Sequence, residues 1–500
     1  MNLTVRQRLL DGLLVHPEEK KSFLIALAIV ALARAQAAVD ITYASDDYRQ
    51  IINGLGSIAH ALVADQGRVG EYVLFKVFDF FGFDPGRSPI ISLLLSVVLA
   101  VWVGNGALRI LAPNLPHWPR ALIISIIAAH PYTIEILTFR GIFIYHIISY
   151  AVAIYAILIA RMHVLWIVAA SFIFSIALTI YQIPLSLVST LLVVELSLSM
   201  IRWCLGSDRI IDRNYYARIL TCVFGLLLYL VWLRLTSGNG GGHPRSSIVD
   251  ISEIPGRIWL GINLLYGHMV DGSVFWVPVV PIPIMLLPAI FLCVAIIELI
   301  IKLKARAAMP VLVIIATPII GGLAMLGMPL LTKLLFIPTR VIPHISLLWA
   351  WSALILWAVM RGRLPRDLFT SLLILIVFIF VVQDNQLFTD QSRMVVRDHY
   401  LALRVYDRIE QINPKPERVI FVRGQTPPTG MVDTTNYGLN DSVLLYPWSA
   451  PYMLTELTGT PFSPATAQEE IEARAHCGET PRWPAQDSVT IRGYLAIVCL

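Results

Sequence analysis

Two adjacent carboxylates, Asp46 and Asp47, are the residues of this sequence best suited to acid–base chemistry. They follow an apolar run and open a stretch with helical spacing of apolar residues, so we expect them at the edge of a membrane. A carboxylate placed there can take a proton from a hydroxyl group, and its charged neighbour disfavours double ionisation. Helix capping by the same two residues is the alternative. The sequence leaves open which aspartate is the base.

Four arginines are candidates for binding a phosphate group, because a guanidinium offers a planar pair of hydrogen-bond donors. Arg49 and Arg68 belong to the same loop as the aspartates, whereas Arg140 and Arg340 come from distant parts of the chain. Solvated or snorkelling side chains are the alternative for the first two. A structural ion pair with Glu135 is the alternative for Arg140.

Further polar residues near the same membrane face are candidates for contacting a substrate, and they are Tyr48, Glu135, Tyr181, Gln182 and Lys333. An aromatic belt explains Tyr181 equally well, and an interfacial anchor explains Lys333 and also Arg340. The cysteines lack metal-ligand spacing, so no metal ligand is assigned and a divalent-cation requirement stays open.

The composition places these residues in a membrane protein. Of the 500 residues, 57% are hydrophobic and only 14% are charged, whereas a soluble domain carries about 25% charged residues. No basic stripe with interleaved aromatic residues indicates a nucleic-acid partner. Apolar runs predict about eleven spans, near residues 22–39, 89–110, 121–138, 141–160, 164–182, 184–202, 217–236, 275–301, 308–328, 343–360 and 367–383.

The distribution of Lys and Arg predicts the orientation. These residues gather at the N-terminus and on alternate connections, which places the N-terminus in the cytoplasm. The first outer loop then carries the aspartate pair and two amphipathic interfacial helices, over residues 48–62 and 72–81. A cleaved signal peptide is the competing reading of the first apolar run.

Residues 384–500 have ordinary polar composition and are expected outside the cytoplasm. Helical spacing runs from Asp398 to Ile412, and short strands are expected at 418–423 and 442–446. Cys477 and Cys499 lie in this part, where an oxidising compartment would join them in a disulfide. We therefore predict an all-α polytopic membrane domain over 1–383 and a small α/β extracytoplasmic domain over 384–500.

Several of these segments, in this order, resemble one family. The loop Asp46–Arg49 with a later Gly67-Arg68 is similar to the first periplasmic loop of the Gtr-type serotype-converting glucosyltransferases, which are bacterial inner-membrane enzymes that decorate O-antigen. The resemblance covers residues 20 to 420 and includes 131–132, Glu135, 139–140, 181–182, 340–343, 389–393 and 397–398. The chain departs from the pattern after Arg140, where an expected aspartate is absent, so the donor sugar stays open.

The resemblance implies a GT-C-like membrane fold in the bacterial inner membrane, with a periplasmic C-terminal domain. It implies transfer of a sugar, glucose in the family, from a polyprenyl-phosphate donor in the membrane to a lipid-linked or O-antigen glycan of the lipopolysaccharide. A flippase and a donor-synthesising enzyme would be its partners. The alternatives are a transporter or flippase for a lipid-linked glycan, in which intramembrane charges mark a pathway, and a glycan polymerase or ligase. No repeat of the kind found in transporters is visible in the sequence.

The expected topology can be tested with reporter fusions. Fusions at Gly240 and at the C-terminus should report an extracytoplasmic location, and fusions at Asp208 and Arg363 a cytoplasmic one, because the Lys and Arg bias alternates between successive connections. A cytoplasmic C-terminus would contradict the eleven-span arrangement.

Overall fold

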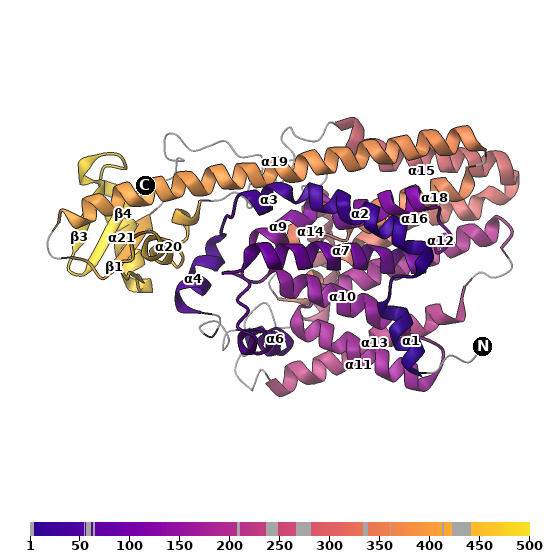
Figure 1. Cartoon of the computed structure of the whole chain (residues 1–500), viewed down its shortest axis with the longest axis horizontal. Coiled ribbons are helices and arrows are strands. Elements are labelled where there is room, and N and C mark those ends of the chain that lie inside the picture. The colour runs from indigo at the N-terminus through magenta and orange to yellow at the C-terminus, as the bar shows by residue number, and fades with distance from the viewer. Residues whose placement is uncertain are drawn as a thin grey trace.

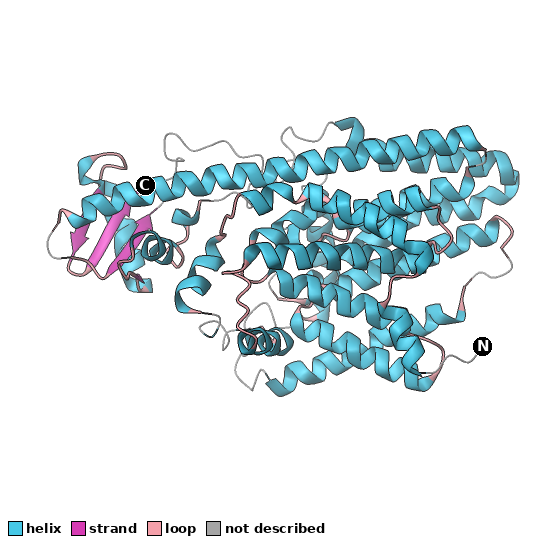
Figure 2. Cartoon of the chain, in the orientation of Figure 1, coloured by secondary structure: helices cyan, strands magenta, loops and turns pink. Residues whose placement is uncertain are grey.

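The computed structural model describes residues 5–54, 56, 62–63, 66–207, 211–236, 249–266, 282–333, 339–360, 362–412, 415–422 and 442–500. The chain is mostly helical, and a small sheet lies near its C-terminus (Figures 1 and 2). A helical bundle and the sheet are joined by one long helix, α19 (Arg363–Glu410), which runs the length of the molecule. Asp208, Gly240 and most of the expected interfacial stretch 54–62 lie outside the described residues.

The bundle begins with α1 (Val5–Leu13), and its remaining helices follow in chain order. They are α2 (Lys20–Ala33), α3 (Ala35–Val39), α4 (Ser45–Asn53), α6 (Val69–Phe80), α7 (Pro89–Leu111), α8 (His117–Ala128), α9 (Ile134–Thr138), α10 (Phe143–Ile159), α11 (Val164–Ile180), α12 (Pro184–Cys204), α13 (Arg213–Thr236), α14 (Ile254–Tyr266), α15 (Ile282–Leu303), α16 (Ala308–Met325), α17 (Gly327–Leu331) and α18 (Ile345–Val359).

Several of these helices are long and apolar enough to cross a membrane. Within the described residues there are five such stretches, namely α7, α12, α13, Leu286–Met325 and Leu364–Glu410, or six if the bent pair α8 and Pro131–Thr138 counts as one. Three shorter apolar helices are α10, α11 and α18. The structure therefore shows a chain with several candidate spans, but it does not show the eleven that the apolar runs predicted.

Two of the predicted apolar runs are interrupted, and one buried ion pair lies at both interruptions. The first run, 22–39, is divided at Arg34 into α2 and α3. The third run, 121–138, bends by 43° after α8. Arg34 pairs with Asp384 of α19, and its Nη2 also donates to Ala128 O at 3.4 Å and to Thr133 Oγ1. Because both charges are buried, removing either one would leave the other unpaired, which is strongly unfavourable.

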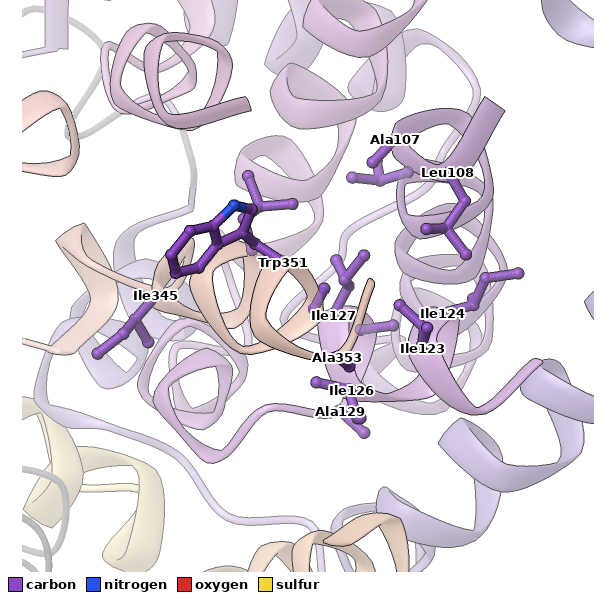
Figure 3. Close-up of a cluster of buried hydrophobic side chains, with 14 of the residues drawn as sticks. Ala107, Leu108, Ile123, Ile124, Ile126, Ile127, Ala129, Ile345, Trp351 and Ala353 are labelled. Atoms are coloured by element: carbon purple, nitrogen blue, oxygen red, sulfur yellow. The ribbon is translucent and has the colours of Figure 1, made fainter. Parts of the chain in front are cut away.

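The core of the bundle lies where α7, α8 and α18 meet (Figure 3). Ile123, Ile124 and Ile127 of α8 pack toward Ala107 and Leu108 of α7. Trp351 of α18 is buried, and its Nε1 donates to Ser197 Oγ of α12 at 3.0 Å. A buried indole needs such a partner, because its N–H would otherwise lose its hydrogen bond to water.

The predicted boundary between residues 383 and 384 falls inside a helix. The helix expected over Asp398–Ile412 forms as the last part of α19, which continues without a break from the bundle. Figure 1 shows this helix projecting from the bundle to the sheet. We call the end of the bundle from which it projects the α4 end, and the opposite end the α1 end.

The sheet has the strand order β2-β1-β4-β3, built from β1 (Arg418–Val422), β2 (Ser463–Pro464), β3 (Val489–Arg492) and β4 (Leu495–Cys499). β1 is parallel to β2 and β4, and β3 is antiparallel to β4. Alternate residues of β1 face different helices, because Val419 and Phe421 join the core with α19 and α20 (Ala450–Thr458). Ile420 and Val422 join the core with α21 (Ala467–Glu479).

Two local expectations need correction. The expected strand 442–446 is a 3-10 turn, Val443–Leu445, whose start is fixed by Asp398, which accepts from Ser442 Oγ and Val443 N at 2.7 and 2.6 Å. The first interfacial helix also differs from the expected continuous helix over 48–62. α4 ends at Asn53, because Gly54 adopts φ +72°, a conformation that L side chains rarely reach, and most of the stretch beyond Gly54 lies outside the described residues.

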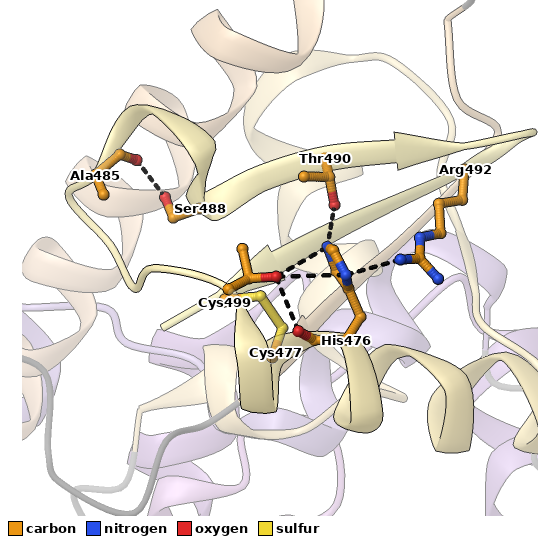
Figure 4. Close-up of a disulfide and its surroundings, with 8 residues drawn as sticks. His476, Cys477, Ala485, Ser488, Thr490, Arg492 and Cys499 are labelled. Atoms are coloured by element: carbon orange, nitrogen blue, oxygen red, sulfur yellow. Dashed lines mark hydrogen bonds between the residues drawn. A yellow bond between two sulfur atoms is a disulfide. The ribbon is translucent and has the colours of Figure 1, made fainter.

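Cys477 and Cys499 are joined in a disulfide that links α21 to β4 (Figure 4). His476, next to Cys477, lies within 2.9 Å of Thr490 Oγ1 on β3 and within 2.8 Å of an Arg492 nitrogen. The link therefore lies beside a second, polar set of contacts between α21 and the sheet edge.

Replacing both cysteines with Ser should lower the free energy of unfolding of the C-terminal part by about 3 kcal/mol, the value typical for a loop of this length. Unfolding of the purified protein in a chaotrope series would measure this difference. Cys293→Ser, at an exposed free cysteine, is the matched control. Two free thiols at 477 and 499 in freshly purified protein would contradict the expected link.

Candidate functional site

The polar residues singled out in the sequence gather at the α4 end of the bundle. α4, α6 and the loop before α10 meet the C-terminus of α11 and the 3-10 turn Thr339–Val341 there. Figure 1 shows α4 between the bundle and the sheet. Segments separated by more than 200 residues therefore supply one group of side chains.

Asp47 is fully buried and accepts three backbone hydrogen bonds. Its Oδ2 accepts from Ala44 N at 2.8 Å and from Arg140 N at 2.9 Å, and its Oδ1 accepts from Gly141 N at 2.8 Å. The carboxylate thus caps α4 and fastens the loop before α10 to it. A Cβ on Gly141 would lie 1.7 Å from Gln50 Oε1, so a larger residue there would have to displace the buried Gln50 side chain.

Burial raises the pKa of Asp47 to about 7, although the backbone N–H groups of Gly141, Ala44 and Arg140 lower it. Such a pKa would suit a general base, but geometry comes before pKa. Both oxygens of Asp47 already accept hydrogen bonds inside the protein, and no part of its side chain is exposed. The structure therefore gives Asp47 the capping role that the sequence left as an alternative.

Asp46 has the opposite environment. It lies in the first turn of α4 and is exposed. Its carboxylate lies close enough to Arg340 to interact with that charge. Consecutive helical residues point about 100° apart, which explains why one aspartate is inside and its neighbour outside.

Arg340 is held in place by Glu135 rather than left to solvent. A guanidinium nitrogen of Arg340 pairs with Glu135 Oε1. The backbone N–H of Arg340 donates to Glu135 Oε2 at 2.7 Å. The guanidinium also lies over the ring of Phe139, 5.0 Å from its centroid. The Arg340 side chain keeps 23% of its surface exposed, so a bound anion can still reach it.

Arg68 approaches the same place from the start of α6. Its Nη1 lies 3.3 Å from Glu71 Oε2, and its guanidinium lies 4.9 Å from the centroid of the Tyr181 ring. Tyr181 in turn stacks on His146 at 3.9 Å. Both Arg68 and Arg340 are near enough to interact electrostatically with this ring pair.

Several buried polar atoms around this ring pair have no hydrogen-bond partner among the described residues. They are Arg68 Nε, Glu71 Oε1, Tyr145 Oη and both ring nitrogens of His146. An unpaired buried polar group costs about 1–3 kcal/mol, so water or a ligand is expected to complete these bonds. Burial also raises the pKa of Glu71, against the lowering effect of Arg68.

His146 and Glu71 were not among the candidates from the sequence. A signal for His146 existed, since it is an ionisable residue within the apolar run that forms α10, and such residues usually face a partner or a cavity. Glu71 gave a weaker signal, because an acidic residue in the first turn of a helix is ordinary.

Other candidates have different environments. Arg140 is fully buried, and its guanidinium donates to Thr42 O and Ala37 O at 3.2 and 3.0 Å. Two of its guanidinium nitrogens therefore tie the loop before α10 to α3 and to the loop before α4, whereas the buried Nη1 has no hydrogen-bond partner among the described residues. The expected alternative pair of Glu135 with Arg140 is replaced by the pair of Glu135 with Arg340.

Tyr48 is buried in the core shared with the C-terminal part, and its hydroxyl lies 2.7 Å from His399 Nε2. Gln182 Nε2 donates to Gln66 O at 3.0 Å and to Tyr229 Oη at 3.1 Å, so it supports the loop before α6. Arg49 and Lys333 are both exposed.

Within the described residues, no group of three or more His, Cys, Asp or Glu side chains could hold a metal ion. No protein-family model, curated protein or solved structure matches this chain.

Asp47→Asn should destabilise the fold by about 1–3 kcal/mol, because a carboxamide has one acceptor oxygen and leaves a buried N–H unpaired. A lower midpoint of thermal unfolding in detergent would measure this. Asp79→Asn, at an exposed position of α6, is the control. An unchanged midpoint for Asp47→Asn would contradict the capping role.

Proposed function

We propose that this chain is a membrane glycosyltransferase that moves a sugar from a polyprenyl-phosphate donor to a lipid-linked or O-antigen glycan. The observation that carries the proposal is the position of Arg68 over Tyr181, beside the buried and unpaired ring nitrogens of His146, with Arg340 and the exposed Asp46 at the same end of the bundle. A phosphate needs the arginines, and an acceptor hydroxyl needs the carboxylate.

In this mechanism the acceptor hydroxyl loses its proton to Asp46 and its oxygen attacks the anomeric carbon of the sugar. The bond between that carbon and the phosphate oxygen breaks, and the lipid phosphate leaves. Arg68 and Arg340 neutralise the charge that grows on the leaving phosphate, which lowers the barrier. Direct displacement inverts the anomeric centre. Glu135 and Glu71 position the two arginines.

The proposal includes a GT-C-like bundle of about eleven spans in the bacterial inner membrane, with the α4 end and the sheet on the periplasmic side. A lipid-linked donor remains in the membrane, so its enzyme needs its polar site at the edge of the spans. Support comes from the position of Asp46, Arg68 and Arg340 outside the long apolar helices.

A transporter or flippase for a lipid-linked glycan is the second candidate, and its pathway would involve the buried polar groups around one small cavity. Apolar residues of α2, α7, α8, α10 and α12 line this cavity inside the bundle together with Arg34, Thr133 and His344. Ser96 Oγ and Tyr150 Oη, also on its wall, are buried without a partner among the described residues. The cavity has a volume of about 60 Å³, which holds water but no sugar. Transport of a fluorescent lipid-linked sugar without bond cleavage would favour this alternative.

Asp46→Asn should lower sugar transfer by about 10²–10⁴-fold, the usual effect of removing a positioned general base. Purified full-length protein, a radiolabelled polyprenyl-phosphate glucose and a lipid-linked glycan acceptor provide the assay. Thermal unfolding should stay unchanged, because Asp46 is exposed. Asp79→Asn is the control, and wild-type turnover by Asp46→Asn would contradict the assigned base.

Arg340→Lys should weaken donor binding by about ten-fold or more, because the charge remains while the paired donors of the guanidinium are lost. Arg68→Lys should behave in the same way. Binding of the radiolabelled donor to the protein in detergent measures the effect. Arg474→Lys, on the exposed surface of α21, is the control. Unchanged binding by both variants would remove the phosphate site from the proposal.

A further inference from the structure

A second polar pocket lies at the α1 end of the bundle, opposite the candidate site. It has a volume of about 790 Å³ and lies among α1, the C-termini of α7 and α10, and the start of α13. Its wall carries charges of both signs, among them Arg161, Arg213, Glu18 and Asp212. The pocket therefore suits a ligand that itself carries both a negative and a positive group.

Some of the charged residues on this wall already form ion pairs within the protein. Glu19 is buried and pairs with Arg109 at 2.6 Å and with Arg120 at 2.7 Å. Arg218 is buried, pairs with Glu195, and keeps its Nε without a partner among the described residues. In contrast, Arg213 is exposed at the first position of α13.

An apolar groove of about 580 Å³ begins beside this pocket. It lies between α11 and α13, and its lining includes Val164, Val168, Phe224 and Leu227. These four side chains keep between 47% and 76% of their surface exposed. A helix face this apolar and open is suited to contact with an alkyl chain.

The linings of the pocket and the groove adjoin at one place in the chain and lie along one face of α13. His163 lines the pocket and the next residue, Val164, lines the groove. On α13, Arg213 and Phe224 are eleven residues apart, about three helical turns, so they share one face of the helix. A molecule with a charged head and an apolar chain could thus occupy both at once.

We propose that this pocket and groove bind one phosphate-headed lipid. Arg161 and Arg213 hold the phosphate, because guanidinium groups pair well with phosphate oxygens. Glu18 and Asp212 complement an ammonium group on the head, which favours a zwitterionic phosphoethanolamine. One acyl chain lies in the groove between α11 and α13. The lipid site is separate from the proposed transfer reaction at the α4 end.

The test is native mass spectrometry of the full-length, delipidated protein in detergent, titrated with dioctanoyl phosphatidylethanolamine or with inorganic phosphate. The lipid should bind saturably as a single adduct and more tightly than phosphate. The double variant Arg161→Gln/Arg213→Gln should weaken lipid binding by about ten-fold or more, as expected for lost charge-assisted hydrogen bonds. Arg306→Gln, exposed between α15 and α16, is the matched control.

A second variant tests the binding of the acyl chain separately from that of the lipid head group. Val168→Trp fills the groove from a position that is 59% exposed, so it should weaken lipid binding and leave phosphate binding unchanged. Leu94→Trp, equally exposed at 59% on α7, should leave both unchanged. Equal binding by all variants, no saturable lipid adduct, or phosphate binding as tightly as the lipid would each overturn the proposal.

Discussion

The carboxylate of Asp47 joins two segments on which the α4 end depends. It accepts hydrogen bonds from the start of α4 and from two successive N–H groups of the loop before α10, all inside the protein. Without it, α4 and that loop would present unpaired donors to each other. The orientation of Asp46, and its proximity to Arg340, follow from this attachment because both aspartates share one helical turn.

Ion pairs between glutamate and arginine occur at both ends of the bundle, but they have different consequences there. At the α1 end, Glu19 binds two arginines and fixes the start of α2 against α7 and α8. At the α4 end, Glu135 holds Arg340, and Glu71 holds Arg68, whose Nε has no hydrogen-bond partner among the described residues. A fully paired arginine stabilises the fold, whereas a partly paired one is prepared for an anion, since its position is fixed before the ligand arrives.

Sequence patterns predicted the elements that depend on residues close together in the chain. The apolar runs give helices, the aspartate pair opens one, and alternating residues form β1. The pairing of Glu135 with Arg340 was beyond reach, because the two residues are 205 positions apart and Arg140 was the nearer partner. The turn at Val443–Leu445 was also missed, since Asp398 decides it from a distant helix. Hydropathy likewise does not predict the interruption at Arg34, because the interruption depends on the ion pair with the distant Asp384.

The unbroken helix α19 restricts how the length of this protein can change. One added residue between the bundle and the sheet would turn everything beyond it by about 100° and advance it by about 1.5 Å. His399 would then swing away from the hydroxyl of Tyr48, which it contacts at 2.7 Å. An insertion of a whole turn would keep the rotation but move the sheet by about 5.4 Å, so α19 fixes both the phase and the distance between the bundle and the sheet.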